Sequence, residues 1–177
     1  MKRADQARDR AFMREALAEA RLAFAKGEIP VGAVAVHRGR VIGRGHNEKE
    51  TRKDPTAHAE VLALQQAAAS RGGWRLLDVT LFCTMEPCPM CAGAMIQARL
   101  PRLVYAVDDP KAGATGSVVD LLHSSALNHQ VEVTRGVLAA EVEELLASFF
   151  EGLRNGSIPR FSENWARQGL AEKGDSM

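Results

Sequence analysis

The sequence predicts an α/β fold in which helices cover the faces of a mixed sheet, and three observations support this prediction. The apolar residues of segment 5–26 recur with the period of a helix. Residues 31–46 contain two short apolar segments around a turn, a pattern typical of an antiparallel hairpin. Helical and strand segments alternate from residue 56 to residue 137, as they do in crossovers that join parallel strands. A hairpin and crossovers in the same sheet make that sheet mixed.

The first helix and the hairpin are the clearest local signals. The helix carries an apolar residue at every fourth position, in the series Phe12, Ala16, Ala20 and Phe24. Gly27 and Pro30 end it. Strands are predicted over 31–37 and 40–46, because both are short apolar segments that flank the turn Arg38-Gly39.

The second half of the chain predicts crossovers. Asp54-Pro55-Thr56 is a helix-start signal, and we expect a helix over 56–70 that ends at Gly72-Gly73. The segment 78–84 reads as a strand buried on both faces, in which Cys83 is a small core residue. The other expected elements are a helix over 88–99, a strand over 102–107, a glycine-rich loop over 108–117, a strand over 131–137 and a helix over 139–154.

Length and composition predict one globular domain. The chain has 177 residues, of which 46% are apolar and 25% charged, so residues 1–154 are expected to bury one full-sized core. Residues 155–177 are polar, and we expect a partly disordered tail. A net charge of +1 means that a nucleic-acid partner would need a local basic patch. The chain lacks both a long apolar run and a secretory signal, which predicts a cytoplasmic protein without a membrane partner.

Two short segments predict a metal site, because each places His or Cys residues at the expected start of a helix. They are PTAHAE at 55–60 and EPCPMC at 86–91. Cys88 and Cys91 are three residues apart and therefore face the same way on a helix, at a start that favours thiolate over thiol. His58 joins them if the two helices lie side by side with their first turns level. One imidazole and two thiolates suit zinc best among the common metals.

The number of ligands predicts a catalytic site with one Zn²⁺ per chain. A structural zinc site has four protein ligands, whereas a catalytic site keeps a position for water, and no other histidine has companion spacing to the cysteines. Glu60, two residues after His58, could exchange protons with that water. Three simpler alternatives exist: a redox or structural Cys-x-x-Cys pair, a capping role for His58, and a helix-dipole role for Glu60.

The combined motif resembles a known family. His-x-Glu followed about 30 residues later by Pro-Cys-x-x-Cys is the signature of zinc-dependent nucleobase deaminases. With TMEPCPMCAGAMIQAR at 84–99 and DDPKAGATGSVVDLL at 108–122, the chain resembles the bacterial tRNA-specific adenosine deaminases of the cytidine/deoxycytidylate deaminase superfamily. The resemblance extends from about residue 10 to residue 154. It implies a cytidine-deaminase-like, three-layer α/β/α fold with a five-stranded mixed sheet and helices on both faces.

The resemblance also implies an activity and partners. The expected reaction is zinc-dependent hydrolysis of adenosine to inosine at the wobble position of a tRNA anticodon, with Glu60 as the acid–base residue. The expected assembly is a homodimer, with a candidate contact face around Met90, Met95 and Ile96. Two alternatives stay open: a deaminase of free bases or nucleosides such as guanine or cytosine, and a non-enzymatic interaction domain stabilised by zinc.

Several substrate contacts follow from the resemblance. Asn47 corresponds to the residue that holds the purine, although an asparagine at this place is also a common turn former. Pro30, Val31 and Ala57 are expected around the base. The expected RNA contacts are Asp109, Lys111, His123, Phe149, Phe150 and Arg154, with one of the two phenylalanines expected to pack inward instead. The chain departs from the family at Pro110, and at Glu151 and Gly152, where relatives tend to be basic.

Local charge gives separate support for RNA. Six basic residues precede His58 closely, namely Arg38, Arg40, Arg44, Lys49, Arg52 and Lys53. A solvated hairpin edge that blocks aggregation is the alternative explanation for this run.

Overall fold

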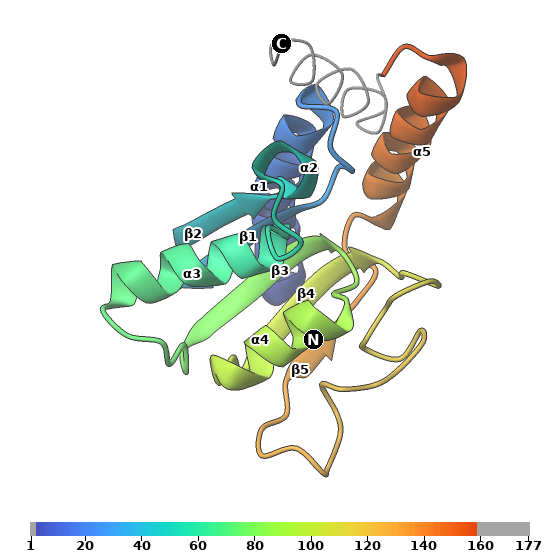
Figure 1. Ribbon diagram of the computed structural model, residues 1–177. Helices are drawn as coiled ribbons and strands as arrows, with labels where there is room; N and C mark the ends of the chain where they lie inside the picture. Colours follow the sequence, from blue (N-terminus) through green and yellow to red (C-terminus); the bar gives the residue numbers. More distant parts are fainter. Residues whose placement is uncertain (1–2, 159–177) are drawn as a thin grey trace, which may run out of the picture.

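The computed structural model describes residues 3–158, which form three layers around a five-stranded sheet (Figure 1). The strands are β1 (Gly32–His37), β2 (Arg40–His46), β3 (Val79–Met85), β4 (Arg102–Val107) and β5 (Glu132–Thr134). The helices are α1 (Arg3–Ala25), α2 (Lys49–Arg52), α3 (Ala59–Arg71), α4 (Pro89–Gln97) and α5 (Ala139–Asn155). Residues 159–177 of the predicted tail lie outside the described residues.

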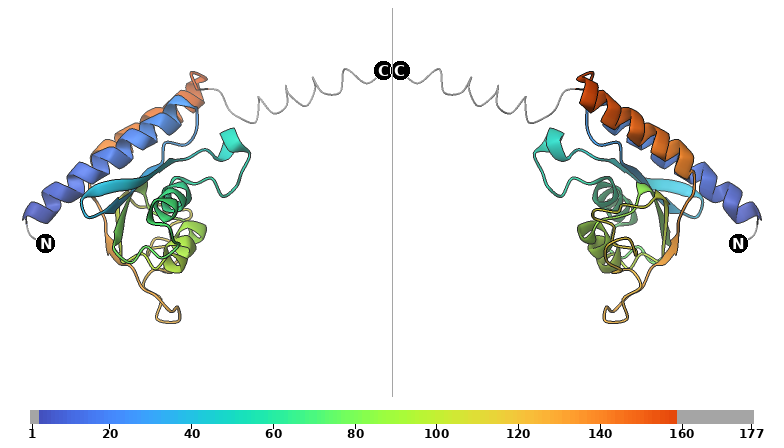
Figure 2. Two further views of the ribbon diagram at one scale, coloured as in Figure 1. Left: turned by 90° about the vertical axis from the view of Figure 1, so that its left-hand side faces the viewer. Right: turned by 90° about the vertical axis from the view of Figure 1, so that its right-hand side faces the viewer.

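The sheet is mixed, as predicted. Its strand order is β2-β1-β3-β4-β5. β1 pairs antiparallel with both β2 and β3, whereas β3–β4 and β4–β5 are parallel. Helices α1 and α5 lie together on one face, and α3 and α4 cover the other (Figure 2). The predicted α/β/α architecture is therefore confirmed. Within residues 3–158, no helix combines the length and the apolar character needed to cross a membrane.

Two elements differ from the prediction. α2 was not expected, because its four residues are too few for a helical period to be visible. β5 is shorter than the predicted strand over 131–137 and ends at Thr134. Gly136 and Leu138 both have positive φ angles, 83° and 59°, and a strand cannot continue through left-handed backbone.

Glycines in the hairpin set how closely two helices approach the sheet. A Cβ on Gly32 would lie 2.2 Å from the Ala16 carbonyl oxygen of α1. A Cβ on Gly45 would lie 2.3 Å from the Ala59 carbonyl oxygen in the first turn of α3. The missing side chains let both backbones pack directly on the hairpin. The start of α3 is thereby held against β2, and this start carries His58.

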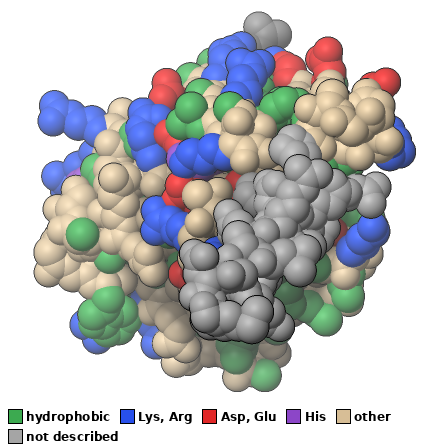
Figure 3. All heavy atoms as spheres, turned by 45° about the horizontal axis from the view of Figure 1, so that its top comes forward, with side chains coloured by type: hydrophobic (Ala, Val, Ile, Leu, Met, Phe, Trp, Pro, Cys, Tyr) green, Lys and Arg blue, Asp and Glu red, His purple; other side chains and the backbone are tan. Residues whose placement is uncertain are grey.

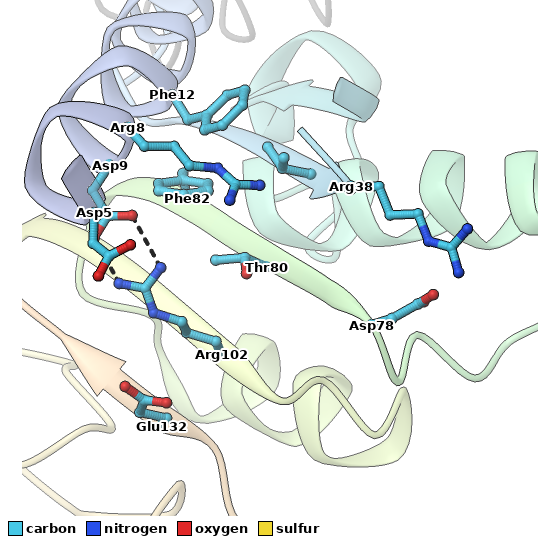
Figure 4. Close-up of a pocket in the computed structure, with 11 residues that line it drawn as sticks. Asp5, Arg8, Asp9, Phe12, Arg38, Asp78, Thr80, Phe82, Arg102 and Glu132 are labelled. Carbon is cyan, nitrogen blue, oxygen red and sulfur yellow. Dashed lines mark hydrogen bonds and ion pairs between the residues drawn. The ribbon is translucent and has the colours of Figure 1, made fainter. Parts of the chain in front are cut away.

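A buried ion pair fastens α1 to β4. The Arg102 guanidinium donates to both carboxylate oxygens of Asp9, at 3.0 and 2.6 Å, and the Asp9 side chain is 3% exposed. Figure 4 shows this pair at the edge of a cavity of about 310 Å³ between α1 and the sheet. Two parallel hydrogen bonds fix the angle between the two groups as well as their distance.

An Asp9→Ala variant is expected to lower the free energy of unfolding by about 3 kcal/mol, because it leaves Arg102 without its partner in a partly buried site. Urea unfolding would measure the loss. Arg10→Ala is the matched control, since Arg10 pairs with Glu141 on the surface and such exposed pairs contribute about 1 kcal/mol or less. Equal losses in the two variants would contradict this role for Asp9.

Candidate active site

Two helix starts bring the predicted metal ligands together. His58 is the N-cap residue of α3, and its side chain makes no capping hydrogen bond, so the imidazole is available for another role. Cys88 is the N-cap residue of α4, with Pro89 in the first helical position. Cys91 follows one turn later and is fully buried. The ligand atoms of these three residues all lie within 4.8 Å of one another.

The spacing of these atoms fits zinc. The Cys88 and Cys91 sulfurs are 3.6 Å apart, and they lie 3.7 and 3.6 Å from His58 Nδ1. A tetrahedral ion with Zn–S near 2.3 Å and Zn–N near 2.0 Å separates its ligand atoms by roughly 3.5–3.8 Å. A disulfide would need sulfurs about 2.0 Å apart, and all three cysteines are free. The donor set and its dimensions therefore match a three-ligand zinc centre better than a redox pair.

Proton affinities in this cluster are strongly shifted. Burial raises the pKa of Glu60 from 4.5 to about 7, and its side chain is almost fully buried. The hydrogen bond with Cys91, and then the neighbouring His58, lower the pKa of Cys88 from 9.0 to about 4. Hydrogen bonding to Cys88 and burial raise the pKa of Cys91. A thiolate is thus favoured at Cys88, while Glu60 is poised to take up and release a proton near neutral pH.

A cavity of about 170 Å³ opens beside this cluster. It is lined by Ile29, Val31, Asn47, Lys49, His58, Ala59, Glu60, Met85, Glu86, Cys88, Asp109 and Ala112. Of the residues expected around the base, Val31 and Asn47 line it. Pro30 and Ala57 are buried next to lining residues but do not line it themselves. Shifted carboxyl and thiol groups in such a cavity are typical of an active site.

Asn47 is held in place by neighbours that the sequence did not reveal. Its side-chain amide donates to a carboxylate oxygen of Glu28 and to the Ile29 carbonyl, both at 3.4 Å. Glu28 is buried and also accepts from the Thr51 amide at 2.7 Å. The side chain of Asn47 is therefore oriented by two successive residues of the segment between α1 and β1.

Glu86 is the main site residue to which the sequence analysis gave no role. It is 2% exposed and accepts hydrogen bonds from the 109–117 loop. Burial acts to raise its pKa, but the bonds from Ser117, Asp109 and Thr115 outweigh burial and lower it. The sequence contained one signal for this role of Glu86. An acidic residue stands directly before Pro87-Cys88, and the 109–117 loop contains the hydroxyl residues Thr115 and Ser117.

The residues predicted to contact RNA divide into exposed and buried ones. Lys111, His123, Phe150 and Arg154 are exposed, and Asp109 lines the cavity. Phe149 was predicted wrongly: it is 1% exposed and packs edge-on against Phe24 of α1, so it belongs to the core.

The departure at Gly152 has a packing explanation. A Cβ at this position would lie 2.7 Å from the side chain of Ile158. Glycine here lets the end of α5 accept Ile158.

The predicted dimer face needs a correction. Met95 and Ile96 are 0% and 4% exposed and pack in the core beneath α4, so they cannot form a surface. Met90 is 36% exposed.

The basic run before His58 is partly neutralised. Arg44 pairs with Glu15 and Glu19, and Arg52 pairs with Glu48. On the face that Figure 3 shows, red carboxylate side chains lie among the blue Lys and Arg side chains. Lys49 lines the cavity.

Comparisons with known proteins agree with this geometry. Residues 7–154 match the MafB19-like deaminase family. The tRNA-specific adenosine deaminase of Bacillus subtilis is 43% identical over 164 residues, which cover 93% of this chain and 98% of the relative. The tRNA-specific adenosine deaminase of Haemophilus influenzae is 48% identical, covering 82% of this chain and 85% of the relative.

Solved structures give the same result. One from a study of A-to-I editing by tRNA:A34 deaminases is 42% identical, with a TM-score of 0.74, over 77% of this chain and 99% of that one. A guanine deaminase from Nitrosomonas europaea is 26% identical, with a TM-score of 0.70, over 79% and 83%. Fold, site and relatives agree, and the chain belongs to the family of tRNA-specific adenosine deaminases.

Proposed function

We propose that the protein deaminates adenosine to inosine at the wobble position of a tRNA anticodon. The observation that carries this proposal is the meeting of one imidazole and two sulfurs beside a buried carboxyl group of raised pKa, in a chain 43–48% identical to tRNA-specific adenosine deaminases. The net reaction adds water at C6 of adenine and releases ammonia.

His58, Cys88 and Cys91 are proposed to hold one Zn²⁺ per chain. Their donor atoms and separations support this assignment. Zinc bound by three protein groups supplies Lewis-acid chemistry, which makes water nucleophilic near neutral pH.

Glu60 is proposed to carry the protons. Its carboxylate takes a proton from the attacking water, gives one to N1 of adenine, and later assists the departure of the amine from C6. A group that both accepts and donates works best with a pKa near the operating pH, and burial has raised the pKa of Glu60 to about 7. Its near-complete burial also keeps bulk water from competing for those protons.

Asn47 and Val31 are proposed to hold the base. The reacting C6 of a stacked base is out of reach of a cavity in the protein, so the adenosine is proposed to leave its stack to enter. Anticodon loops present such splayed bases. Lys49 at the cavity and the exposed Lys111, His123, Phe150 and Arg154 are proposed to contact the flanking nucleotides.

We also propose a homodimer that works in the cytoplasm, where the tRNA substrate is found. Exposed apolar side chains are candidates for the contact, namely Met90 on α4 and Val118 and Val119 in the loop after β4. Light scattering at micromolar concentration distinguishes a dimer from a monomer of 19.2 kDa.

A guanine deaminase activity is the second candidate, because the Nitrosomonas europaea enzyme shares the fold at a TM-score of 0.70. The purified protein should be incubated with an anticodon stem-loop that carries a wobble adenosine and, separately, with guanine, cytosine and free adenosine. We expect inosine in the stem-loop and no turnover of the free compounds. Release of ammonia from guanine alone would overturn the tRNA proposal.

A further inference from the structure

The carboxylate of Glu86 collects hydrogen bonds from the whole 109–117 loop. Oε2 accepts from the Asp109 amide at 2.9 Å and from the Ser117 hydroxyl. Oε1 accepts from the Thr115 amide at 2.9 Å, with the Thr115 hydroxyl at 2.9 Å and the Ser117 amide at 3.3 Å. The first and last parts of the loop are thus bound to one side chain at the end of β3.

A carboxylate suits the centre of this arrangement, because backbone amides point at both of its oxygens. Every neighbour that contacts the two oxygens is an N–H or O–H group, and an ionised carboxylate offers about four acceptor positions and no donor. Glutamine has the same shape but would direct an NH₂ group at the donors on one side. The hydroxyl groups could turn to accept from that NH₂ group, but the backbone N–H groups could not, so at least one amide contact would be lost and a buried donor left unsatisfied.

The packing of Gly113 shows that the loop is built around this carboxylate. A Cβ at position 113 would lie 2.2 Å from Glu86 Oε2 and 2.6 Å from the Asp109 carbonyl oxygen. The loop backbone therefore lies directly on the Glu86 side chain. Gly113 also donates its amide to the Asp109 carbonyl oxygen at 2.9 Å, which closes the turn around the same point.

The loop that Glu86 holds forms one wall of the catalytic cavity. Asp109 and Ala112 line that cavity together with Val31 and Asn47. The Asp109 side chain is used within the turn, where Oδ1 accepts from the Lys111 and Ala112 amides at 2.9 and 3.2 Å. The position of this wall therefore depends on backbone bonds to Glu86.

We propose that Glu86 is a positioning residue for substrate recognition, which fixes the 109–117 loop as the wall of the base cavity and the platform for the nucleotides next to it. The hydrogen bonds of Glu86 reach the 109–117 loop, whereas His58, Cys88 and Cys91 are carried by the starts of α3 and α4. Loss of the Glu86 contacts should consequently weaken substrate binding more than the chemical step. This inference rests on the proposed deaminase function.

The test compares Glu86→Gln with wild-type enzyme on the wobble-adenosine stem-loop. We expect KM to rise about tenfold or more and kcat to change less than about threefold, because the lost interactions act on binding. Zinc content by elemental analysis should remain equal to that of wild type. Hydrogen exchange of the 109–117 amides should become faster in the variant even without RNA.

Two further variants separate the proposal from a general loss of stability. Ser117→Ala removes one hydroxyl donor and should raise KM by less than Glu86→Gln does. Glu86→Asp keeps the charge but retracts it, so it should restore part of the exchange protection. A variant that was merely unstable would lose active enzyme and lower apparent kcat at unchanged KM.

The outcomes distinguish this inference from the proposed function. If wild type edits the stem-loop and Glu86→Gln has an unchanged KM and unchanged loop exchange, the inference is wrong. If wild type does not edit the stem-loop, the proposed function fails, and the exchange experiment still shows whether Glu86 orders the loop.

Discussion

A Glu60→Ala variant is expected to lose about 10²–10⁴-fold in kcat on a wobble-adenosine stem-loop, the range typical of general acid–base catalysis. Glu60 is the buried carboxyl group beside the metal ligands, and its pKa of about 7 lets it both accept and donate a proton at neutral pH. Alanine can do neither. Single-turnover assays with excess enzyme would measure the chemical step without interference from product release.

Glu60→Gln makes the prediction sharper, because it keeps the size of the side chain. It should lose activity to a similar extent while retaining zinc. Its resistance to urea should be undiminished, because burial disfavours the ionised carboxylate that the substitution removes. Glu144→Ala, an exposed change in α5, is the control and should leave kcat unaltered. A Glu60→Gln enzyme with undiminished turnover would refute the proton-transfer role.

The metal ligands could be predicted from the sequence because they lie on local signals. His58 and Cys88 are N-cap residues, and Cys91 is one turn further, so helix-start patterns place all three. The alternation of elements then gives crossovers, and crossovers bring such helix starts to the same edge of a sheet. The short strand β5 and the four-residue α2 lacked any comparable pattern.

The residues around the base were harder to predict, because their partners are distant in the sequence. Glu86 is bonded to residues 23 to 31 positions away, and Glu28 reaches Asn47 across 19 positions. No periodicity encodes such contacts. They depend on where the turns place backbone amides.

The helical period decides which of the two phenylalanines of α5 packs inward. Phe149 lies seven residues after the buried Val142, which puts both on the same helix face, whereas Phe150 falls outside that phase. The period alone could have assigned Phe149 to the core. α4 is different, since it is apolar on most positions and its period does not distinguish Met90 from Met95.

A Cys91→Ala variant is expected to lose both zinc and activity. It removes one of three proposed ligands, and the two that remain cannot fix a metal in a defined position. Because a metal of this kind contributes several kcal/mol of transition-state stabilisation, kcat should fall by at least about a thousandfold. Elemental analysis would show zinc falling from about one ion per chain to a small fraction, and added zinc should not restore turnover.

Cys83→Ala provides a matched control for that experiment. Cys83 is equally buried and its thiol donates to the Met85 carbonyl oxygen at 3.0 Å, but it is not part of the metal cluster. The variant should retain zinc and, as we also expect of wild type, recover activity after treatment with a chelator followed by zinc, with at most a modest loss of stability from the small cavity. The opposite result would be a full equivalent of zinc in Cys91→Ala and a loss of zinc in Cys83→Ala. It would mean that Cys83 of β3, and not Cys91 of α4, is the metal ligand, and the chemistry proposed at the start of α4 would be wrong.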